Sequence, residues 1–386
     1  MTPFAFNTTK SVVFETGAAA RMAEFAGATL GKTVLLITDS GLRKLGLLDP
    51  ALHSLTDAGH EVVVFDGVEA DPSRETLEQA VEVGRTIGAT GVLGFGGGSP
   101  MDVAKLTALL LGSEEDLDSA WGVAQAKGPR LPLVLVPTTA GTGSEVTPVA
   151  IITVGAEEKR GVSSPIILPD IAILDADLTR ELPPHITAAT GVDAMVHAIE
   201  AYASTSANNN PMSQLLAREA LRLLGANIET AVFEGGNAAA RGAMLLGSML
   251  AGQAFANSPV AAVHALAYPI GGTFHIPHGL SNALVLPHVL RFNAPEAHAV
   301  YAEIAADAFP HLAEVEGSQA RCAAFIEALE NLAETLGMQT RLRDVGIPES
   351  ALAKMAEDAM LQQRLLVNNP RSVSEADALA IYRAAW

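Results

Sequence analysis

Short runs of β-branched and other apolar residues alternate with helical patterns along the first half of the chain. This alternation is typical of a sheet flanked by helices. The runs near residues 34, 91 and 131 are apolar on both faces, as expected of buried parallel strands, whereas residues 11–15 are predicted to form an edge strand. The full set of central runs comprises residues 34–39, 61–66, 91–96, 131–137, 150–153 and 171–175. We therefore predict an α/β domain with a parallel sheet over residues 1–182.

The pattern changes after Pro183 and Pro184, because the β-branched runs stop and Ala- and Leu-rich helical periods continue to Trp386. Turn-forming residues at 204–211 and 234–237 indicate loops between these helices. A chain of 386 residues usually needs more than one hydrophobic core. We therefore predict a second, all-helical domain over residues 183–386.

A glycine-rich turn joins one buried strand to a helix in the first domain. The strand at 91–96 runs directly into Gly97, Gly98 and Ser99. Glycine lets the backbone approach a pyrophosphate, Ser99 can cap the helix, and a helix N-terminus attracts an anion. The turn is therefore a candidate pyrophosphate site, with a plain strand-to-helix connection as the alternative.

Two charged residues follow in the first turns of this helix. Asp102 occupies the position of a capping-box acid. Lys105 is expected to add a positive charge near the phosphates. The segment matches neither the Walker A spacing nor GxGxxG, so the dinucleotide hypothesis also depends on the neighbouring strands.

Those strands add two features that suit a dinucleotide. The strand at 131–137 ends in a loop whose Thr138, Thr139 and Thr142 offer hydroxyl groups to ribose or amide groups, although a hydrophilic turn is the alternative. Asp39 ends the first buried strand, where a carboxylate can bind ribose hydroxyls and repel a 2′-phosphate. It could equally cap the helix that follows. We predict a preference for NAD over NADP.

Four candidate metal ligands lie in the second half of the chain. Asp193 and His197 are spaced i,i+4 and share one helix face, while His264 and His278 lie further along. A single histidine in an apolar helix is more often a packed core residue than a ligand, but a buried carboxylate needs a partner. One carboxylate and three imidazoles suit a divalent first-row metal. Four protein ligands plus a substrate oxygen exceed the tetrahedral shell usual for zinc, which favours Fe(2+) over Zn(2+).

The segment between the two later histidines is predicted to separate two helices. Pro269 and the pair Gly271 and Gly272 are expected to end the helix of His264. His278 then begins the next apolar run. The two imidazoles can therefore converge from different helices.

Composition narrows the class of partner. The 43 acidic and 24 basic residues give a net charge of −19, which disfavours nucleic acid and anionic membranes. Cys322 is the single cysteine, so a reducing compartment is expected. The N-terminal residues lack a secretion signal, and no apolar run has membrane-spanning length. We expect a cytoplasmic protein.

Several segments resemble the iron-containing alcohol dehydrogenases, namely GGGSPMDVAK, PTTAGTGSEVTP, GVDAMVHAIEAY, VHALAYPIGG with the following PHG, and NNPR at 368–371. The resemblance covers nearly the whole chain. It implies a dinucleotide-binding α/β domain, a helical metal domain and an active site in the cleft between them. It also places the family's metal ligands on Asp193, His197, His264 and His278.

The same resemblance assigns the cofactor side. The family's contacts fall on Asp39, Gly97, Gly98, Ser99, Thr138 and Thr139. A lysine that members often carry aligns with Lys159 or Arg160. Tyr268 stands where many members have a histidine that could relay a proton, and Tyr268 and Phe255 are candidate pocket walls.

The implied reaction is a reversible hydride transfer between a small primary alcohol and NAD, with the metal polarising the substrate oxygen. Maleylacetate reductase, a zinc-dependent glycerol dehydrogenase and a dehydroquinate-synthase-like lyase are alternatives within the fold. A catalytically silent subunit is the alternative from another class. A homodimer or larger homo-oligomer is also expected.

Overall fold

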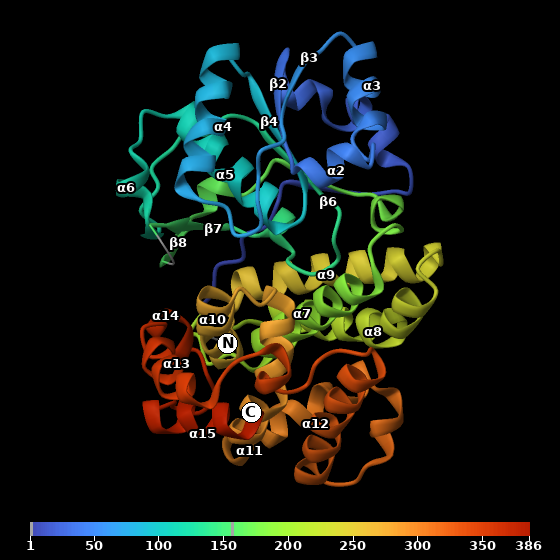
Figure 1. The fold of residues 1–386 in the computed structure, drawn as a ribbon. Coiled ribbons are helices and arrows are strands. Elements are labelled where there is room, and N and C mark those ends of the chain that lie inside the picture. Colours follow the sequence, from blue (N-terminus) through green and yellow to red (C-terminus); the bar gives the residue numbers. More distant parts are fainter. Residues whose placement is uncertain (1–2, 156–157) are drawn as a thin grey trace. The chain divides into compact units, whose positions relative to one another are not determined.

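The computed structural model describes residues 3–155 and 158–386 (Figure 1). Within these ranges the chain forms two compact units. One is Asn7–Arg180, and the other is Glu181–Trp386 together with the N-terminal segment that ends at Phe6. That segment is tied to the helical unit by the amide of Ala5, which donates to Asn208 Oδ1 at 2.9 Å.

A six-stranded sheet organises the first unit, and its neighbouring strands are all parallel. The strand order is β1-β9-β6-β4-β2-β3. The strands are β1 (Ser11–Phe14), β2 (Thr33–Ile37), β3 (Glu61–Phe65), β4 (Gly91–Gly96), β6 (Leu133–Pro137) and β9 (Ile171–Leu174). Strands β4 and β6 are fully buried and β1 lies at an edge, which confirms the predicted parallel α/β fold.

A small second sheet was not predicted from the sequence. The run at 150–153 forms β7 (Val149–Val154), which pairs antiparallel with β8 (Glu158–Ser163) rather than joining the main sheet. Strand β8 also pairs with β5 (Gly122–Val123). The sequence EKRGVS of β8 has no apolar run, and β5 has two residues. Periodicity therefore carried no signal for either strand.

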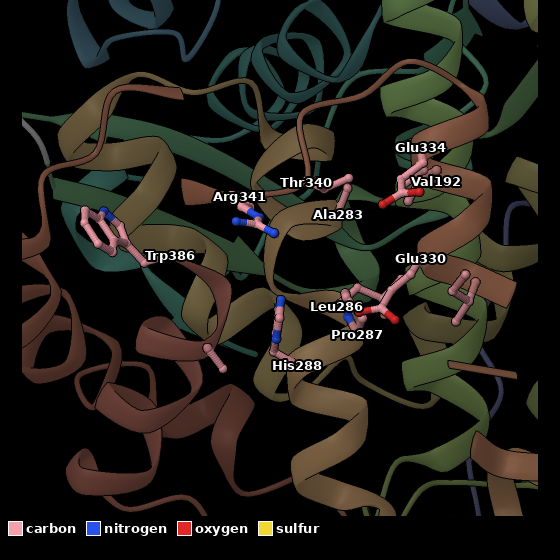
Figure 2. Close-up of a pocket in the computed structure, with 13 residues that line it drawn as sticks. Val192, Ala283, Leu286, Pro287, His288, Glu330, Glu334, Thr340, Arg341 and Trp386 are labelled. Atoms are coloured by element: carbon pink, nitrogen blue, oxygen red, sulfur yellow. The ribbon is translucent and has the colours of Figure 1, made fainter. Parts of the chain in front are cut away.

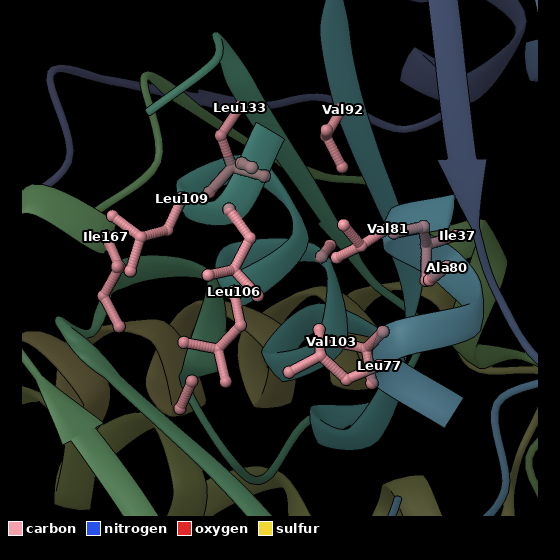
Figure 3. Packing of buried hydrophobic residues seen from close by; sticks show 14 of the residues in the cluster. Ile37, Leu77, Ala80, Val81, Val92, Val103, Leu106, Leu109, Leu133 and Ile167 are labelled. Carbon is pink, nitrogen blue, oxygen red and sulfur yellow. The ribbon is translucent and has the colours of Figure 1, made fainter. Parts of the chain in front are cut away.

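Helices and short helical turns connect the strands of the first unit. They are η1 (Ala18–Arg21), η2 (Ala23–Gly27), α1 (Ala28–Leu30), α2 (Ser40–Lys44), α3 (Asp49–Asp57), α4 (Arg74–Ile87), α5 (Gly98–Gly112), α6 (Leu117–Ala120), η3 (Ser144–Val146), η4 (Pro165–Ile167) and η5 (Ala176–Thr179). Val103 and Leu106 of α5 pack in one core cluster with Leu77 of α4 and Val92 of β4 (Figure 3). A Cβ at Gly94 would lie 2.7 Å from Ala104 Cβ, so glycine in β4 allows α5 to approach the sheet closely.

The described residues of the second unit form helices and loops without a strand, as predicted. Its elements are α7 (Pro184–Ala203), α8 (Pro211–Phe233), α9 (Ala238–Asn257), α10 (Ala262–Phe274), α11 (His278–Ala308), η6 (Pro310–Glu314), α12 (Ser318–Thr335), η7 (Leu342–Val345), η8 (Glu349–Ala351), α13 (Leu352–Ala359), α14 (Gln363–Leu366) and α15 (Glu375–Ala385). The predicted loops between α7 and α8 and between α8 and α9 are both present. No helix in the described part of the chain is long and apolar enough to cross a membrane.

The prediction that Pro269 and the pair Gly271 and Gly272 end the His264 helix is wrong. Helix α10 continues through Pro269 and ends at Phe274, where His275 takes a left-handed conformation with φ 55°. A proline inside a helix costs about 3 kcal/mol, but the residues from Ala262 to Ala267 are all buried, and this packing maintains the helix. The interruption that separates His264 from His278 is therefore the turn at 275–277.

Candidate metal centre and nucleotide-binding loops

The structure brings the four predicted metal ligands together. Asp193 and His197 lie on α7, His264 on α10, and His278 is the first residue of α11. One ligand atom from each lies within 4.8 Å of the others. Asp193, His197 and His264 are buried, whereas His278 is exposed. The imidazole rings of His197 and His264 stack with centroids 4.8 Å apart, and those of His264 and His278 are 5.4 Å apart.

Close packing of two helices places His278 beside Asp193. A Cβ at Gly279 would lie 2.3 Å from the carbonyl oxygen of Ala189 and 3.3 Å from Asp193 Cβ. Only glycine therefore permits this approach of α11 to α7. In the pair His278-Gly279, the histidine supplies the donor atom, and the glycine allows α11 to approach α7 closely enough for that atom to join the cluster.

The buried carboxylate stays charged because of its neighbours. Burial alone would raise the pKa of Asp193, but His197, His278 and His264, together with the amide of Asn282, hold it below its usual range. An ionised carboxylate among imidazole nitrogens is a donor set that a divalent first-row metal prefers. The residues present thus fit the metal that the sequence predicts.

Asn282 on α11 adds evidence for this fit and was missed by the sequence analysis. Its Nδ2 donates to Asp193 Oδ1 at 2.6 Å and lies 3.2 Å from His264 Nε2 and 3.3 Å from His278 Nε2. One atom from each of three predicted ligands therefore lies within hydrogen-bond distance of the same amide nitrogen, which occupies the middle of the cluster. Asn282 Oδ1 is buried and accepts no hydrogen bond from the described residues.

Glu200 is a second residue that the sequence analysis missed. Its Oε2 lies 2.7 Å from His264 Nδ1, and its Oε1 accepts from the amide of Val263 at 2.7 Å. A proton on Nδ1 leaves Nε2 of His264 as the electron-pair donor toward the cluster. The available signal was a charged residue inside an apolar helix, three residues after His197.

Two aromatic side chains border the cluster. The ring of Phe255 stacks on His197 with centroids 4.4 Å apart. The ring of Tyr268 lies 6.3 Å from that of His278, and Arg364 donates to the Tyr268 hydroxyl at 3.3 Å. Both predicted wall residues are therefore adjacent to the predicted metal ligands.

The predicted cofactor residues of the α/β unit gather at the carboxyl ends of neighbouring strands. Asp39, Gly97 and Thr138 follow β2, β4 and β6, which are adjacent in the sheet. A Cβ at Gly97 would lie 3.6 Å from the side chain of Thr139, and one at Gly98 would lie 3.0 Å from that of Thr142. The glycine turn and the threonine loop therefore face each other.

Three local expectations near this edge need correction. Gly97, not Ser99, is the N-cap of α5, and no side chain caps this helix, because the extended backbone of Gly97 starts the helix earlier. Asp102 is not part of a capping box, since its carboxylate accepts from Ser144 Oγ at 2.7 Å and from the amide of Ile151 at 2.9 Å. Lys105 is fully buried and bonded to other protein groups, so its charge is not available at the turn.

The two remaining cofactor candidates have structural partners. Asp39 caps α2, because its Oδ1 accepts from the amides of Gly41 and Leu42 at 2.9 Å each. This is the alternative that the sequence left open. Lys159 lies on β8 of the small sheet, with Nζ 2.7 Å from Asp71 Oδ1 and 3.0 Å from Thr153 Oγ1.

A cavity of about 390 Å³ occurs elsewhere in the helical unit (Figure 2). Its walls come from α7, α11, α12 and the C-terminal residues, and include His288, Arg341 and Trp386. None of the four predicted metal ligands lines it. It is therefore distinct from the metal centre.

Two family models match nearly the whole chain. Residues 9–176 match the model described as iron-containing alcohol dehydrogenase, and residues 187–386 match the C-terminal model of the Fe-containing alcohol dehydrogenase family. Long-chain-alcohol dehydrogenase 1 of Geobacillus thermodenitrificans is 43% identical over 361 residues, which cover 92% of this chain and 90% of that protein.

Solved structures give the same result. The crystal structure of a 1,3-propanediol oxidoreductase has a TM-score of 0.95 and 36% identity, with 100% of both chains covered. Sulfoacetaldehyde reductase from Bifidobacterium kashiwanohense, solved in complex with NAD+, has a TM-score of 0.87 and 28% identity, covering 100% of this chain and 98% of that one. With both family models matched and the relatives covered almost from end to end, the chain belongs to the iron-containing alcohol dehydrogenase family.

Proposed function

We propose that this metal-dependent alcohol dehydrogenase oxidises small primary alcohols with NAD and reduces the corresponding aldehydes. The observation that carries the proposal is the convergence of Asp193, His197, His264 and His278, whose ligand atoms lie within 4.8 Å of one another. The family supplies the reaction class. The narrower statements about substrate size and cofactor rest on the residues described next.

Iron(II) is the metal we propose for these four ligands, with zinc as the alternative. When bound, it supplies Lewis-acid chemistry that polarises the carbon–oxygen bond of the substrate. Glu200 fixes the orientation of the His264 ring, and Asn282 holds the Asp193 carboxylate. Phe255 and Tyr268 shield the substrate from water and limit its size.

NAD is the cofactor we propose for the strand ends of the α/β unit. When bound, it would supply hydride-transfer chemistry, with the hydroxyl proton of the alcohol released in oxidation and taken up again in aldehyde reduction. Gly97, Gly98 and Ser99 offer backbone amides at the start of α5 for the pyrophosphate. Thr138, Thr139 and Thr142 offer hydroxyl groups on the facing loop, and Asp39 and Lys159 are the remaining proposed contacts. The NAD+ complex of the related sulfoacetaldehyde reductase supports this choice.

We further propose that the enzyme acts in the cytoplasm as a homodimer or larger homo-oligomer. The single cysteine, Cys322, is in keeping with a reducing compartment. Light scattering on the purified, metal-loaded protein measures the subunit number directly.

The test of the proposed function uses protein loaded with iron(II) and a panel of small alcohols and aldehydes with NAD or NADH. We expect reduced nicotinamide to form from primary alcohols, and His264→Ala and His278→Ala to be metal-poor and nearly inactive. His185→Ala, which changes an exposed histidine on α7, is the matched control. Full activity in either ligand variant would reject the metal assignment. Maleylacetate is assayed beside the panel, and turnover of maleylacetate alone would reject the alcohol assignment.

A further inference from the structure

The α/β unit contains a lysine with no exposure to solvent. Lys105 lies on α5, two turns after the glycine turn, and its side chain is 0% exposed. Its Nζ donates to Ser144 Oγ at 2.7 Å, to Thr147 Oγ1 at 3.2 Å and to the carbonyl oxygen of Val149 at 2.7 Å. All three partners lie in the segment that leads from the threonine loop into β7.

A second charged side chain of α5 binds the same segment. Asp102 Oδ1 accepts from Ser144 Oγ at 2.7 Å and lies 3.6 Å from Lys105 Nζ, while Oδ2 accepts from the amide of Ile151 at 2.9 Å. Ser144 thus receives a hydrogen bond from Lys105 and donates one to Asp102. The helix that begins at the glycine turn is fastened to the end of the threonine loop by charged groups.

This arrangement is costly for the fold. Desolvation lowers the pKa of Lys105 to about 8 and raises that of the buried Glu145 to about 7. Glu145 Oε1 accepts no hydrogen bond from the described residues. Apolar side chains of similar volume can often replace buried charges without loss of stability. The cluster therefore calls for a role in addition to stability.

The threonine loop is fixed at both ends, and its residues 138–143 form neither a helix nor a strand. At its start, the amide of Thr138 donates to the carbonyl oxygen of Gly96 at 3.0 Å. At its end, Lys105 and Asp102 hold Ser144 and its neighbours. Thr139 and Thr142, which face Gly97 and Gly98, lie between these two attachments.

We propose that Lys105 is a positioning residue for the nucleotide cofactor, which holds the loop from Thr138 to Thr147 against α5 so that Thr139 and Thr142 face the glycine turn. The inference rests on the proposed binding of NAD at this edge of the sheet. Ordering a flexible loop when the cofactor binds costs conformational entropy. A loop that is already held in place avoids this cost, so the protein binds the cofactor more tightly.

The experiment uses Lys105→Met in the full, iron-loaded chain, with NADH as the probe. We expect the dissociation constant of NADH, measured by fluorescence titration without substrate, to rise about tenfold or more. The KM for NAD should rise similarly, while the KM for the alcohol and the iron content stay unchanged, because the metal ligands lie in the other unit. At saturating NAD, kcat should fall by less than about threefold.

Arg130→Met is the matched control. Arg130 is also a largely buried cation of the same unit, and it donates to the carbonyl oxygens of Ile166 and Leu168 and to Asp170. Its removal should lower the midpoint of thermal unfolding without weakening NADH binding. Ser144→Ala, which keeps the lysine but removes the hydroxyl group between Lys105 and Asp102, should weaken NADH binding in the same direction and covers the case in which Lys105→Met does not fold.

Three results would decide against the proposal. Folded Lys105→Met or Ser144→Ala proteins that bind NADH within about twofold of the parent would overturn it. Equal weakening by Arg130→Met would overturn it too, because general loss of stability would then explain the effect. A parent protein that turns over alcohols only with another cofactor would reject the proposed use of NAD, and with it this role of Lys105.

Discussion

At the scale of single residues, Glu200 is expected to set the affinity of the metal centre without being a ligand. Its two oxygens accept from two different donors, the Val263 amide and His264 Nδ1. Glu200→Gln leaves one acceptor for these two donors, so the His264 ring loses its fixed orientation. We expect a 10- to 100-fold lower affinity for iron(II), of about the size usual for a lost ligand-orienting hydrogen bond. A competition titration with a metal-binding dye measures it.

Glu303→Gln provides the comparison for this prediction, because Glu303 also accepts a hydrogen bond in the helical unit, from the Tyr202 hydroxyl at 2.7 Å. The affinity of the Glu303→Gln variant for iron(II) should match that of the parent protein. If Glu200→Gln also binds iron like the parent, Glu200 does not orient the ligand.

The clustering of the four predicted ligands could be anticipated from the sequence because each combines a donor group with an unusual position in or beside an apolar helix. Asp193 and His197 share a face through their spacing, and His278 follows a clear break in the pattern. Glu200 and Asn282 were not found, because their importance lies in contacts with residues 64 and 89 positions away in the sequence. The hydrogen-bond partners of Lys105 were not predicted either, because they also lie far away in the sequence. The spacing of two residues along one helix can be read directly from the sequence. The partner of a buried polar side chain cannot, because it depends on which distant segments pack together.

At the scale of secondary-structure elements, the contact between α7 and α11 is expected to determine where His278 lies. Strands and helices were largely predictable from periodicity, but Pro269 shows that packing can maintain a helix against a local breaker. Gly279 is the corresponding packing constraint at the metal centre, because a Cβ added there would lie 2.3 Å from the Ala189 carbonyl oxygen. Gly279→Ala should move α11 away from α7, lower stability by about 1–3 kcal/mol and weaken metal binding.

Gly272→Ala is the matched substitution, because a Cβ there meets nothing within 4 Å and the residue also lies in a helix. It should be neutral or stabilising by up to about 1 kcal/mol, since alanine favours a helix more than glycine. Chemical denaturation of both variants with and without iron(II) gives the comparison. Equal effects of the two substitutions would show that the helix contact does not control the metal centre.

At the scale of the whole molecule, we propose that the cofactor is bound mainly by the unit Asn7–Arg180 and the metal by the helical unit. A ligand slows local opening most strongly in the elements that hold it, because it binds the closed form and not the open one. Hydrogen exchange followed by mass spectrometry should therefore show that iron(II) protects α7, α10 and the start of α11, whereas NADH protects the turn at the start of α5 and the loop after β6. The iron effect should vanish in His278→Ala, while the NADH effect should persist there, because the four predicted metal ligands all come from the helical unit. Protection of the α5 turn by iron(II) alone would contradict the proposed assignment of the metal to the helical unit.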